Sequence, residues 1–235
     1  MRKVEVCFSP ELIHLHELKG KIVVVVDIFR ATSTMVAALA HGITEIKTFA
    51  ELEECRAMSD QGYVIAGERE GLTAPGFEMG NSPVTFLAGD FAGRKLAMTT
   101  TNGTQAIHKS AGAFEILIGA FPNLSATTRY IQSLEKDVLI HCAGWKGRFN
   151  LEDSLYAGAL VSSLEKTHIP DEDAALAMLA LFEKEGNDLK GFLSQASHAK
   201  RLQNHHIEND IDFCLTLDLY DLVVKMDARG FLVKA

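Results

Sequence analysis

The sequence predicts an α/β fold, with α/β/α layers around a largely parallel sheet and a mostly helical C-terminal quarter. Along most of the chain, short apolar β-branched runs alternate with segments of helical period, which is typical of βα units that supply buried parallel strands. The run Ile22–Val26 is wholly aliphatic. Helical period returns at 171–185 and 197–205. We expect one catalytic domain over residues 1–235, or two lobes that meet near residues 89–93.

The expected elements follow one another in a regular order. Strands are expected at 21–27, 44–49, 63–67, 95–99, 114–118 and 137–142. Helices are expected at 32–41 and 51–61, and from residues 104, 125 and 154 onward. Residues 67–83 read GEREGLTAPGFEMGNSP, and their glycines and prolines predict an irregular loop. Loops of this length in compact domains are usually functional or disordered.

The composition limits the partners and the location of the protein. The net charge is −8 and the Lys and Arg residues form no cluster, which argues against binding to nucleic acid. The longest apolar run is far shorter than the roughly 20 residues that span a bilayer, and the first residues lack the apolar segment of a signal peptide. The four cysteines have no C-x-x-C spacing. We therefore expect a cytoplasmic protein that does not bind membranes; the sequence leaves open whether it forms a homo-oligomer.

Ligands of parallel sheets bind beyond the carboxyl ends of the strands, so polar residues at strand-to-helix turns are site candidates. The first such turn carries Asp27 and Arg30, followed by the hydroxyls of Thr32, Ser33 and Thr34 at an expected helix start. A helix N-terminus suits phosphate, and arginine adds a fork of donors. The alternative is that the hydroxyls only cap the helix and Arg30 is a surface charge. Burying an acid and an arginine is unfavourable without a purpose, which favours a binding function.

Two later turns are also candidates for substrate binding. One places hydroxyls, an amide and a glycine before a helix, at Thr100, Thr101, Asn102, Gly103 and Thr104. Its backbone N–H groups could bind an oxyanion, or the turn could cap itself. The other turn follows the strand at 114–118 and contains Asn123, whose simplest role is an N-cap.

The long loop begins with Glu68 and Arg69 and ends with Asn81 and Ser82, which we expect to contact the substrate. Glu68 ends a strand as Asp27 does, so we expect the two carboxylates to face one another and to share a divalent cation. Oxygen ligands of this kind suit Mg²⁺, which keeps several waters and bridges to a substrate phosphate. A solvated run of charges is the alternative.

The turn after the strand at 137–142 suggests two different chemistries. Cys142 and Arg148 have the C-x₅-R spacing of cysteine-dependent phosphatases, in which a thiolate attacks phosphorus. Glu152 and Asp153 follow, and they would repel a bound phosphate dianion unless a metal ion lay between them. These paired acids therefore fit a Mg²⁺ site better than a cysteine-dependent phosphatase. Alternatively, Cys142 is simply a small buried residue at a strand end.

Other histidines and motifs carry less information. The pair His14 and His16 is best interpreted as surface or capping residues, and the pair His205 and His206 as a solvated helix end. The chain contains no P-loop, no G-x-G-x-x-G and no G-x-S-x-G sequence, which disfavours nucleotide-binding and serine-hydrolase functions.

Five strings occur in an order that resembles the 2-phosphosulfolactate phosphatase family: VVVVDIFRATST, GERE with the distal GNSP, TTTNGT, GAFPN, and CAG followed by G-x-F-x-LED. The resemblance covers residues 27 to about 153 and continues faintly through the string SHAKRL at 197–202. It implies an α/β fold and Mg²⁺-dependent hydrolysis of (2R)-O-phospho-3-sulfolactate, a reaction associated with coenzyme M biosynthesis. The matched motifs contain the candidate residues already named, together with Gly144.

From the residues and the resemblance together we form one hypothesis about the site. Asp27, Glu68 and one of Glu152 or Asp153 hold Mg²⁺, while Arg30 and the loop 100–104 bind the phosphoryl oxygens. Arg69 or Arg148 binds the carboxylate or sulfonate of a small phosphorylated acid. Two alternatives stay open: Cys142 is the nucleophile of a metal-independent phosphatase, or the protein is a non-catalytic anion sensor.

Overall fold

The computed structural model describes residues 1–203 and 208–235, and the side chains of residues 1–200 and 208–235. His205, His206 and the end of the helix expected at 197–205 lie outside the described residues. The strands are β1 (Arg2–Cys7), β2 (Ile22–Val26), β3 (Ile46–Thr48), β4 (Val64–Arg69), β5 (Leu72–Thr73), β6 (Leu96–Thr99), β7 (Glu115–Gly119), β8 (Val138–Cys142), β9 (His168–Pro170), β10 (Val224–Met226) and β11 (Leu232–Lys234).

The helices are α1 (Ala31–Ala40), α2 (Leu52–Arg56), α3 (Pro83–Ala88), α4 (Gly103–Lys109), α5 (Leu124–Leu134), α6 (Leu151–Leu164), α7 (Asp173–Glu185), α8 (Leu189–Leu193), α9 (Ser197–Gln203) and α10 (Glu208–Leu215). Short 3₁₀ turns occur at η1 (Ile13–Leu15), η2 (Ala57–Gln61), η3 (Phe121–Asn123) and η4 (Gly186–Asp188). The α/β fold class expected from the sequence, including the mostly helical stretch after α6, is confirmed.

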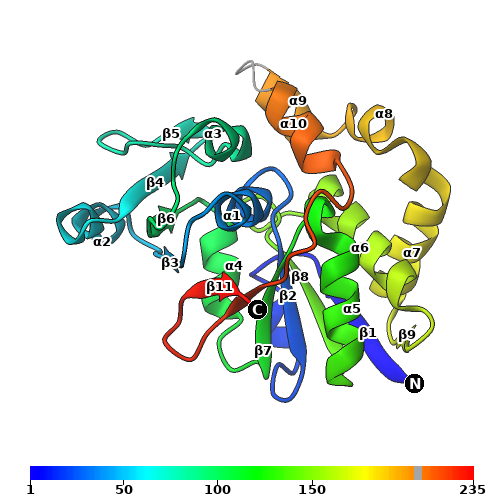
Figure 1. Cartoon of the computed structure of the whole chain (residues 1–235). Coiled ribbons are helices and arrows are strands. Elements are labelled where there is room, and N and C mark those ends of the chain that lie inside the picture. The colour runs from blue at the N-terminus through cyan, green and yellow to red at the C-terminus, as the bar shows by residue number, and fades with distance from the viewer. Residues whose placement is uncertain (204–207) are drawn as a thin grey trace.

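The strands are hydrogen-bonded in the order β5-β4-β6-β3-β11-β10-β7-β2-β8-β1-β9. One parallel group consists of β7, β2, β8, β1 and β9, and the other of β3, β6 and β4. The C-terminal hairpin β10–β11 joins them, since β10 pairs antiparallel with β7 and β11 with β3. Figure 1 shows the β3–β6 segment on one side of the molecule and the β1, β2, β7 and β8 strands on the other. Residues 89–93 connect α3 to β6 on the first side.

The β2–α1 unit lies at the centre of the fold. All residues of β2 are fully buried, as expected for a strand between two parallel neighbours. The residues of α1 from Ala31 to Leu39 are buried as well, and this helix packs against α3, α4 and β7. A helix that is buried on every side lies within the core. The turn between β2 and α1 is therefore enclosed by other elements, and it carries Asp27 and Arg30.

The expected irregular loop at 67–83 is wrong in its first part. β4 continues to Arg69 and pairs antiparallel with β5, with Glu68 opposite Thr73. Glu70 and Gly71 form the two-residue turn, and both have positive φ, at 56° and 83°, as a type I′ hairpin requires. Glu-Gly is a weaker hairpin signal than Asn-Gly or Asp-Gly, so the sequence did not reveal this turn.

Several other elements were not expected from the sequence. β1, β9, β10 and β11 were missed, as were α3, α8 and α10. The hairpin strands β10 and β11 have three residues each, too few for a period to be recognised. Val224 and Leu232 are nevertheless fully buried, because both strands are paired on either side within the sheet. Tertiary pairing rather than local propensity determines these strands.

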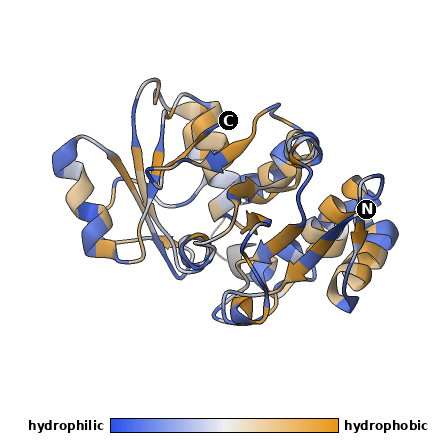
Figure 2. Cartoon of the chain, turned by 90° about the horizontal axis from the view of Figure 1, so that it is seen from below, coloured by the Kyte–Doolittle hydropathy of each residue, from blue (hydrophilic) through white to orange (hydrophobic). Residues whose placement is uncertain are grey.

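Apolar residues concentrate on the sheet and on the helix faces that cover it. Figure 2 shows the hydrophobic colour on the inner strands, while α2 at the edge of the molecule is largely hydrophilic. One large buried cluster includes β2, β7, β8, α1 and α6, and a smaller one lies between α2 and β4. In the described part of the chain, no helix is both long and apolar enough to cross a membrane.

Candidate active site

Residues from both strand groups line one small cavity. They lie after β2, on and after β4, before α3 and α4, after β8, and on α9. The lining residues are Asp27, Phe29, Arg30, Glu68, Gly71, Asn81, Asn102, Trp145 and His198. The cavity lies at the carboxyl ends of the parallel strands, where ligands of such sheets bind. Asp27 and Glu68 share it, as the sequence suggested, although several strands separate β2 from β4 in the sheet order.

Asp27 is held by the turn that it begins. The backbone N–H of Ala31 donates to its Oδ1 at 3.4 Å. The hydroxyl of Thr32 accepts from the backbone N–H of Asp27 and donates to its carbonyl oxygen, at 3.0 and 2.9 Å. Burial raises the pKa of the Asp27 carboxyl to about 6, against the opposing effect of His198, and Glu68 and Glu152 raise it as well. Asp27 is therefore a buried acid with other acids as neighbours.

Glu152 and Asp153 begin α6 and have different surroundings. Asp153 accepts hydrogen bonds from the backbone N–H groups of Ile28, at 2.8 Å, and Gly144, at 3.1 Å. Burial, followed by the charges of Asp27 and Glu152, raises the pKa of Asp153 well above its usual value. Glu152 Oε1 lies 2.5 Å from His198 Nδ1, while its Oε2 is buried with no hydrogen-bond partner among the described residues. Of the two acids, Glu152 is therefore the one with a carboxylate oxygen that no described residue engages.

Glu68 connects the β4–β5 hairpin to the loop before α4. Its Oε1 accepts from the backbone N–H of Gly71 at 2.5 Å. Its Oε2 accepts from the backbone N–H of Thr101 at 3.2 Å and from the Thr101 hydroxyl at 3.1 Å. These bonds turn the carboxylate toward the cavity that it lines with Asp27.

Arg30 is almost fully buried, and its guanidinium is anchored at two points. Nη1 donates to Asp210 Oδ2 of α10, and Nη2 donates to the carbonyl oxygen of Gly71 at 3.0 Å. Its Nε has no acceptor among the described residues. The surface position that the sequence left open for Arg30 is thus wrong, because the side chain is 5% exposed.

The loop 100–104 caps itself, which was one of its two expected roles. Thr104 N–H donates to Thr100 Oγ1 at 3.2 Å, and Thr100 N–H donates to Thr104 Oγ1 at 3.3 Å. Asn102 lines the cavity, and its Oδ1 accepts from the backbone N–H of Lys146 at 3.1 Å. Gly103 lies so close to Asp27 that a Cβ would come within 2.7 Å of Asp27 Oδ2. Asn102 and Gly103 therefore shape the cavity, while the two threonines stabilise the turn.

Other expected binding residues have their polar groups engaged in the fold. Ser33 donates to the carbonyl oxygen of Ile28 at 2.9 Å, and Thr34 donates to that of Asn81 at 2.6 Å. Ser82 donates to Asp210 Oδ1 at 2.6 Å. Asn123 is fully buried and caps its turn, with its amide bonded to backbone groups of residues 118, 120 and 222. None of these side chains except Asn81 lines the cavity.

The two arginines expected to bind a second acidic group differ in position. Arg69 donates to the carbonyl oxygens of Glu68 and Ala50 and to Thr99 Oγ1. Arg148 is exposed, and its backbone pairs with that of Trp145, which lines the cavity. Gly144, directly before Trp145, has a φ of +58°, and a Cβ there would lie 2.4 Å from the Arg148 carbonyl oxygen. Of the two arginines, Arg148 is the one placed on a cavity loop with its side chain in solvent.

Cys142 is fully buried at the end of β8. Burial, followed by the charge of Asp153, raises the pKa of its thiol well above the usual value. A cysteine nucleophile needs the opposite shift, toward a thiolate at neutral pH. The surroundings of Cys142 thus favour the structural role and argue against the cysteine-dependent mechanism.

Sequence reasoning missed the site contributions of Phe29, Trp145, His198 and Asp210. His198 lies with its ring 5.4 Å from that of Trp145 and 6.0 Å from that of Phe29, so aromatic rings form one wall of the cavity. The string SHAKRL at 197–202 was noted in the sequence only as a faint extension of the family pattern. Asp210 carried no signal, because an acid in an acidic helix is usually solvated.

The donor chemistry around the cavity fits a cation. Four carboxylates, those of Asp27, Glu68, Glu152 and Asp153, are buried together. Glu152 Oε2 and Asn81 Oδ1 are buried oxygens with no hydrogen-bond partner among the described residues. Within the described part of the chain, no three or more His, Cys, Asp or Glu side chains form a ready metal cluster. Mg²⁺ commonly binds through one or two carboxylates plus water and phosphate, so the expected Mg²⁺ site stays a prediction that these residues fit.

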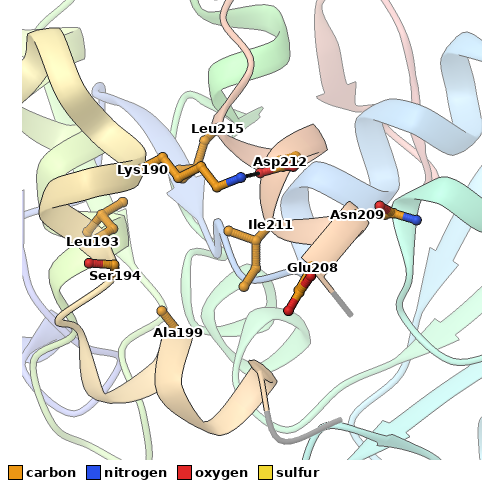
Figure 3. A pocket seen from close by; sticks show the side chains of 9 residues that line it. All are labelled: Lys190, Leu193, Ser194, Ala199, Glu208, Asn209, Ile211, Asp212 and Leu215. Carbon is orange, nitrogen blue, oxygen red and sulfur yellow. Dashed lines mark ion pairs between the residues drawn. The ribbon is translucent and has the colours of Figure 1, made fainter. Parts of the chain in front are cut away.

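A second cavity, of about 310 Å³, lies between α8, α9 and α10. Figure 3 shows its lining, with Lys190 paired to Asp212 above the apolar side chain of Ile211. It contains none of the buried acids of the first cavity. Of these two cavities, the one lined by Asp27 and Arg30 is the candidate site, and it is called the acid cavity below.

Buried acids and a buried arginine thus lie together at the strand ends of an α/β protein. Residues 7–229 match the family described as 2-phosphosulpholactate phosphatase. Similar proteins include the probable 2-phosphosulfolactate phosphatases of Thermotoga maritima, 41% identical over 90% of this chain and 91% of the relative, and of Caldanaerobacter subterraneus, 37% identical over 89% of both. That of Clostridium novyi is 33% identical over 94% of this chain and 95% of the relative. The chain belongs to the 2-phosphosulpholactate phosphatase family of phosphoric monoester hydrolases, which confirms the resemblance drawn from the five motifs.

We expect Gly103→Ala to lower the phosphatase activity without unfolding the protein. The new Cβ would lie 2.6 Å from Ala31 Cβ and 2.7 Å from Asp27 Oδ2, so Asp27 must shift. If Asp27 acts at the site as the sequence hypothesis expects, a displacement of about 1 Å should reduce kcat/KM by about 10- to 100-fold. Phosphate release measures the loss, circular dichroism checks the fold, and Gln105→Ala on the same helix is the control. Unchanged kcat/KM would show that the activity does not depend on the exact position of the Asp27 carboxylate.

We expect Asp27→Asn to stabilise the protein at pH 7.5 in the presence of a chelator. The folded state raises the pKa of Asp27 from 3.8 to about 6, so it binds more protons than the unfolded chain between those values. The contribution of Asp27 to the unfolding free energy therefore falls as pH rises through this window. Above it, removal of the charge should raise the unfolding free energy by about 1–3 kcal/mol. Urea denaturation at pH 7.5 and at pH 4 measures this gain, which should shrink at the lower pH, and the exposed Asp60→Asn should show none.

We expect Cys142→Ala to keep the phosphatase activity within about threefold, because a protonated buried thiol contributes packing rather than nucleophilic attack. Iodoacetamide should leave the native enzyme active for the same reason. Abolished activity in a folded Cys142→Ala protein would instead support the thiolate mechanism.

Proposed function

We propose that this chain is a Mg²⁺-dependent phosphatase of small 2-phospho-2-hydroxyacids, with (2R)-O-phospho-3-sulfolactate as its substrate. The observation that carries the proposal is the acid cavity of this member of the phosphatase family. Asp27, Glu68 and the buried Arg30 line it, and Glu152 and Asp153 are buried close to Asp27. The relatives are named probable 2-phosphosulfolactate phosphatases, which supports the choice of substrate. The products are 3-sulfolactate and phosphate.

In this proposal the acids divide into ligands and supports. Asp27, Glu68 and Glu152 would hold Mg²⁺ directly or through water, since Glu152 Oε2 is free among the described residues. Asp153 would support them, because its two oxygens bind the backbone N–H groups of Ile28 and Gly144. When bound, the metal would neutralise charge on the phosphoryl and leaving oxygens and make a water molecule more acidic.

Arg30 and the turns around it would bind the phosphoryl oxygens. Its guanidinium is fixed in direction before a ligand arrives, because Nη1 and Nη2 are both anchored. A donor that is already oriented stabilises developing charge without reorganising. Asn81 and Asn102 line the same cavity and would add amide groups to this binding.

The acid group at the far end of the substrate would meet a cation at the rim of the cavity. Arg148 is the better of the two arginines, since Arg69 is engaged by β4, β6 and the segment after β3. Lys146, on the same loop as Trp145, pairs with the exposed Glu70 at 2.6 Å. These two cations would distinguish a phosphorylated acid from a phosphomonoester that has no second acidic group.

A phosphate-release assay with Asp27→Asn, with Glu152→Gln and with chelator tests the proposal. We expect each to reduce kcat by at least about 100-fold, and Mg²⁺ to restore the chelated wild type. Asp60→Asn, an exposed acid, serves as the matched control. Full activity in the variants and in chelator would overturn the metal mechanism. Thermal stabilisation of the wild type by the substrate without any turnover would instead identify an anion sensor.

A further inference from the structure

The helix α10 brings an acid into contact with Arg30 from 180 residues further along the chain. Asp210 and Arg30 have side chains that are 2% and 5% exposed, so their ion pair is almost fully removed from solvent. Asp210 Oδ1 also accepts from Ser82 Oγ at 2.6 Å, at the start of α3. The carboxylate is therefore held between the β2–α1 turn and α3, and both of its oxygens have partners.

Arg30 forms its ion pair with Asp210 although other buried acids lie close to it. Asp27 and Glu68 line the same cavity as Arg30, yet no ion pair connects Arg30 to either of them in the described residues. Without Asp210, the guanidinium would be free to approach these carboxylates and neutralise them. Asp210 thus keeps Arg30 apart from the acids that the proposed function requires.

The geometry also leaves part of the guanidinium available for a ligand. Nη1 is anchored by Asp210 and Nη2 by the Gly71 carbonyl, whereas Nε has no acceptor among the described residues. A planar guanidinium held at its two terminal nitrogens has its plane fixed in space. Each remaining N–H group then has a fixed direction, which is what bidentate recognition of a phosphoryl group needs.

We propose that Asp210 is a positioning residue for the phosphoryl-binding arginine, so that the phosphate site is complete only when α10 is docked against α3 and the β2–α1 turn. This inference rests on the proposed function, in which Arg30 binds the phosphoryl group. Ser82 assists by orienting Asp210, which assigns a role to a residue that the sequence predicted to contact substrate directly.

Asp212 on the same helix provides a matched control. It lies two residues after Asp210 and forms an ion pair with Lys190 at 2.5 Å, but both side chains are more than half exposed. Figure 3 shows this pair at the second cavity, whose lining does not include Arg30. Asp210→Asn and Asp212→Asn therefore make the same chemical change on one helix, at a buried ion pair and at an exposed one.

The experiment compares kcat, KM and inhibition by inorganic phosphate in these two variants. We expect Asp210→Asn to lower kcat/KM by about 10- to 100-fold and to raise the inhibition constant of phosphate by about tenfold. Asp212→Asn should change each by less than about twofold. Ser82→Ala should weaken phosphate inhibition in the same direction but by less. Unchanged phosphate inhibition in Asp210→Asn would overturn the proposal.

A double-mutant cycle separates positioning from a general effect on the fold. In an Arg30→Gln background, Asp210→Asn should cause little further loss of phosphate binding, because the group that it positions is gone. Equal losses in the two backgrounds would mean that Asp210 acts through stability alone. If Asp210→Asn does not fold, the Ser82→Ala variant and its cycle with Arg30→Gln decide the question by the same criterion.

The result is also distinguishable from failure of the proposed function. Inorganic phosphate binding can be measured by calorimetry without any turnover. A wild type that binds phosphate through Arg30 and Asp210 but hydrolyses no 2-phospho acid would keep this inference and reject the proposed substrate. If the wild type hydrolyses the substrate and Asp210→Asn has no effect on phosphate binding, the proposed function is kept and this inference is rejected.

Discussion

The mutual repulsion of buried carboxylates is the constraint around which this site is built. Asp27, Glu68, Glu152 and Asp153 are buried together at the carboxyl ends of the strands, and burial raises the pKa of Asp27 and Asp153. Such a group is unfavourable unless hydrogen bonds and cations offset its charge. The fold supplies backbone N–H groups to Asp27, Glu68 and Asp153, and an imidazole to Glu152. The negative charge that these groups leave uncompensated favours binding of a cation.

The hydrogen bonds that stabilise the acids also connect the parts of the molecule. Asp153 joins α6 to the β2–α1 turn and to the β8–α6 turn, and Glu68 joins the β4–β5 hairpin to the loop before α4. Each carboxylate therefore fixes the position of a neighbouring backbone segment. Rigid segments of this kind hold a site in one geometry before the ligand binds, which reduces the reorganisation that catalysis requires.

Arg30 receives its counter-charge from outside this group of acids. Asp210 pairs with it from α10, and His198 reaches Glu152 from α9. Both helices come after the five recognised motifs in the chain. The C-terminal helices thus complete a site whose other components come from the β2 to α6 region.

The sequence by itself determined the α/β class, the central β2–α1 unit and the turns on which most site acids lie. This was feasible because aliphatic strands and helical periods are local patterns, and because the carboxyl ends of parallel strands meet at one edge. Asp27, Arg30, Glu68, Asn81 and Asn102 were all identified in this way, and all line the acid cavity. Ser33, Thr34 and Asn123 were chosen by the same rule, but their polar side-chain groups bond to backbone groups of the protein. A turn motif does not show whether a polar side chain binds a ligand or stabilises the backbone.

Only the tertiary structure decided which distant residues meet at the site. The short strands β10 and β11 depend on partners in β7 and β3, so no local pattern marks them. Asp210 looks like an ordinary surface acid in the sequence, and it becomes a partner of Arg30 because α10 packs against α3. Cys142 matched a phosphatase spacing, yet its burial raises the pKa of the thiol and opposes that chemistry. Burial and long-range pairing are properties of the folded chain as a whole. They decide whether a residue that matches a sequence motif has the surroundings that its expected chemistry requires.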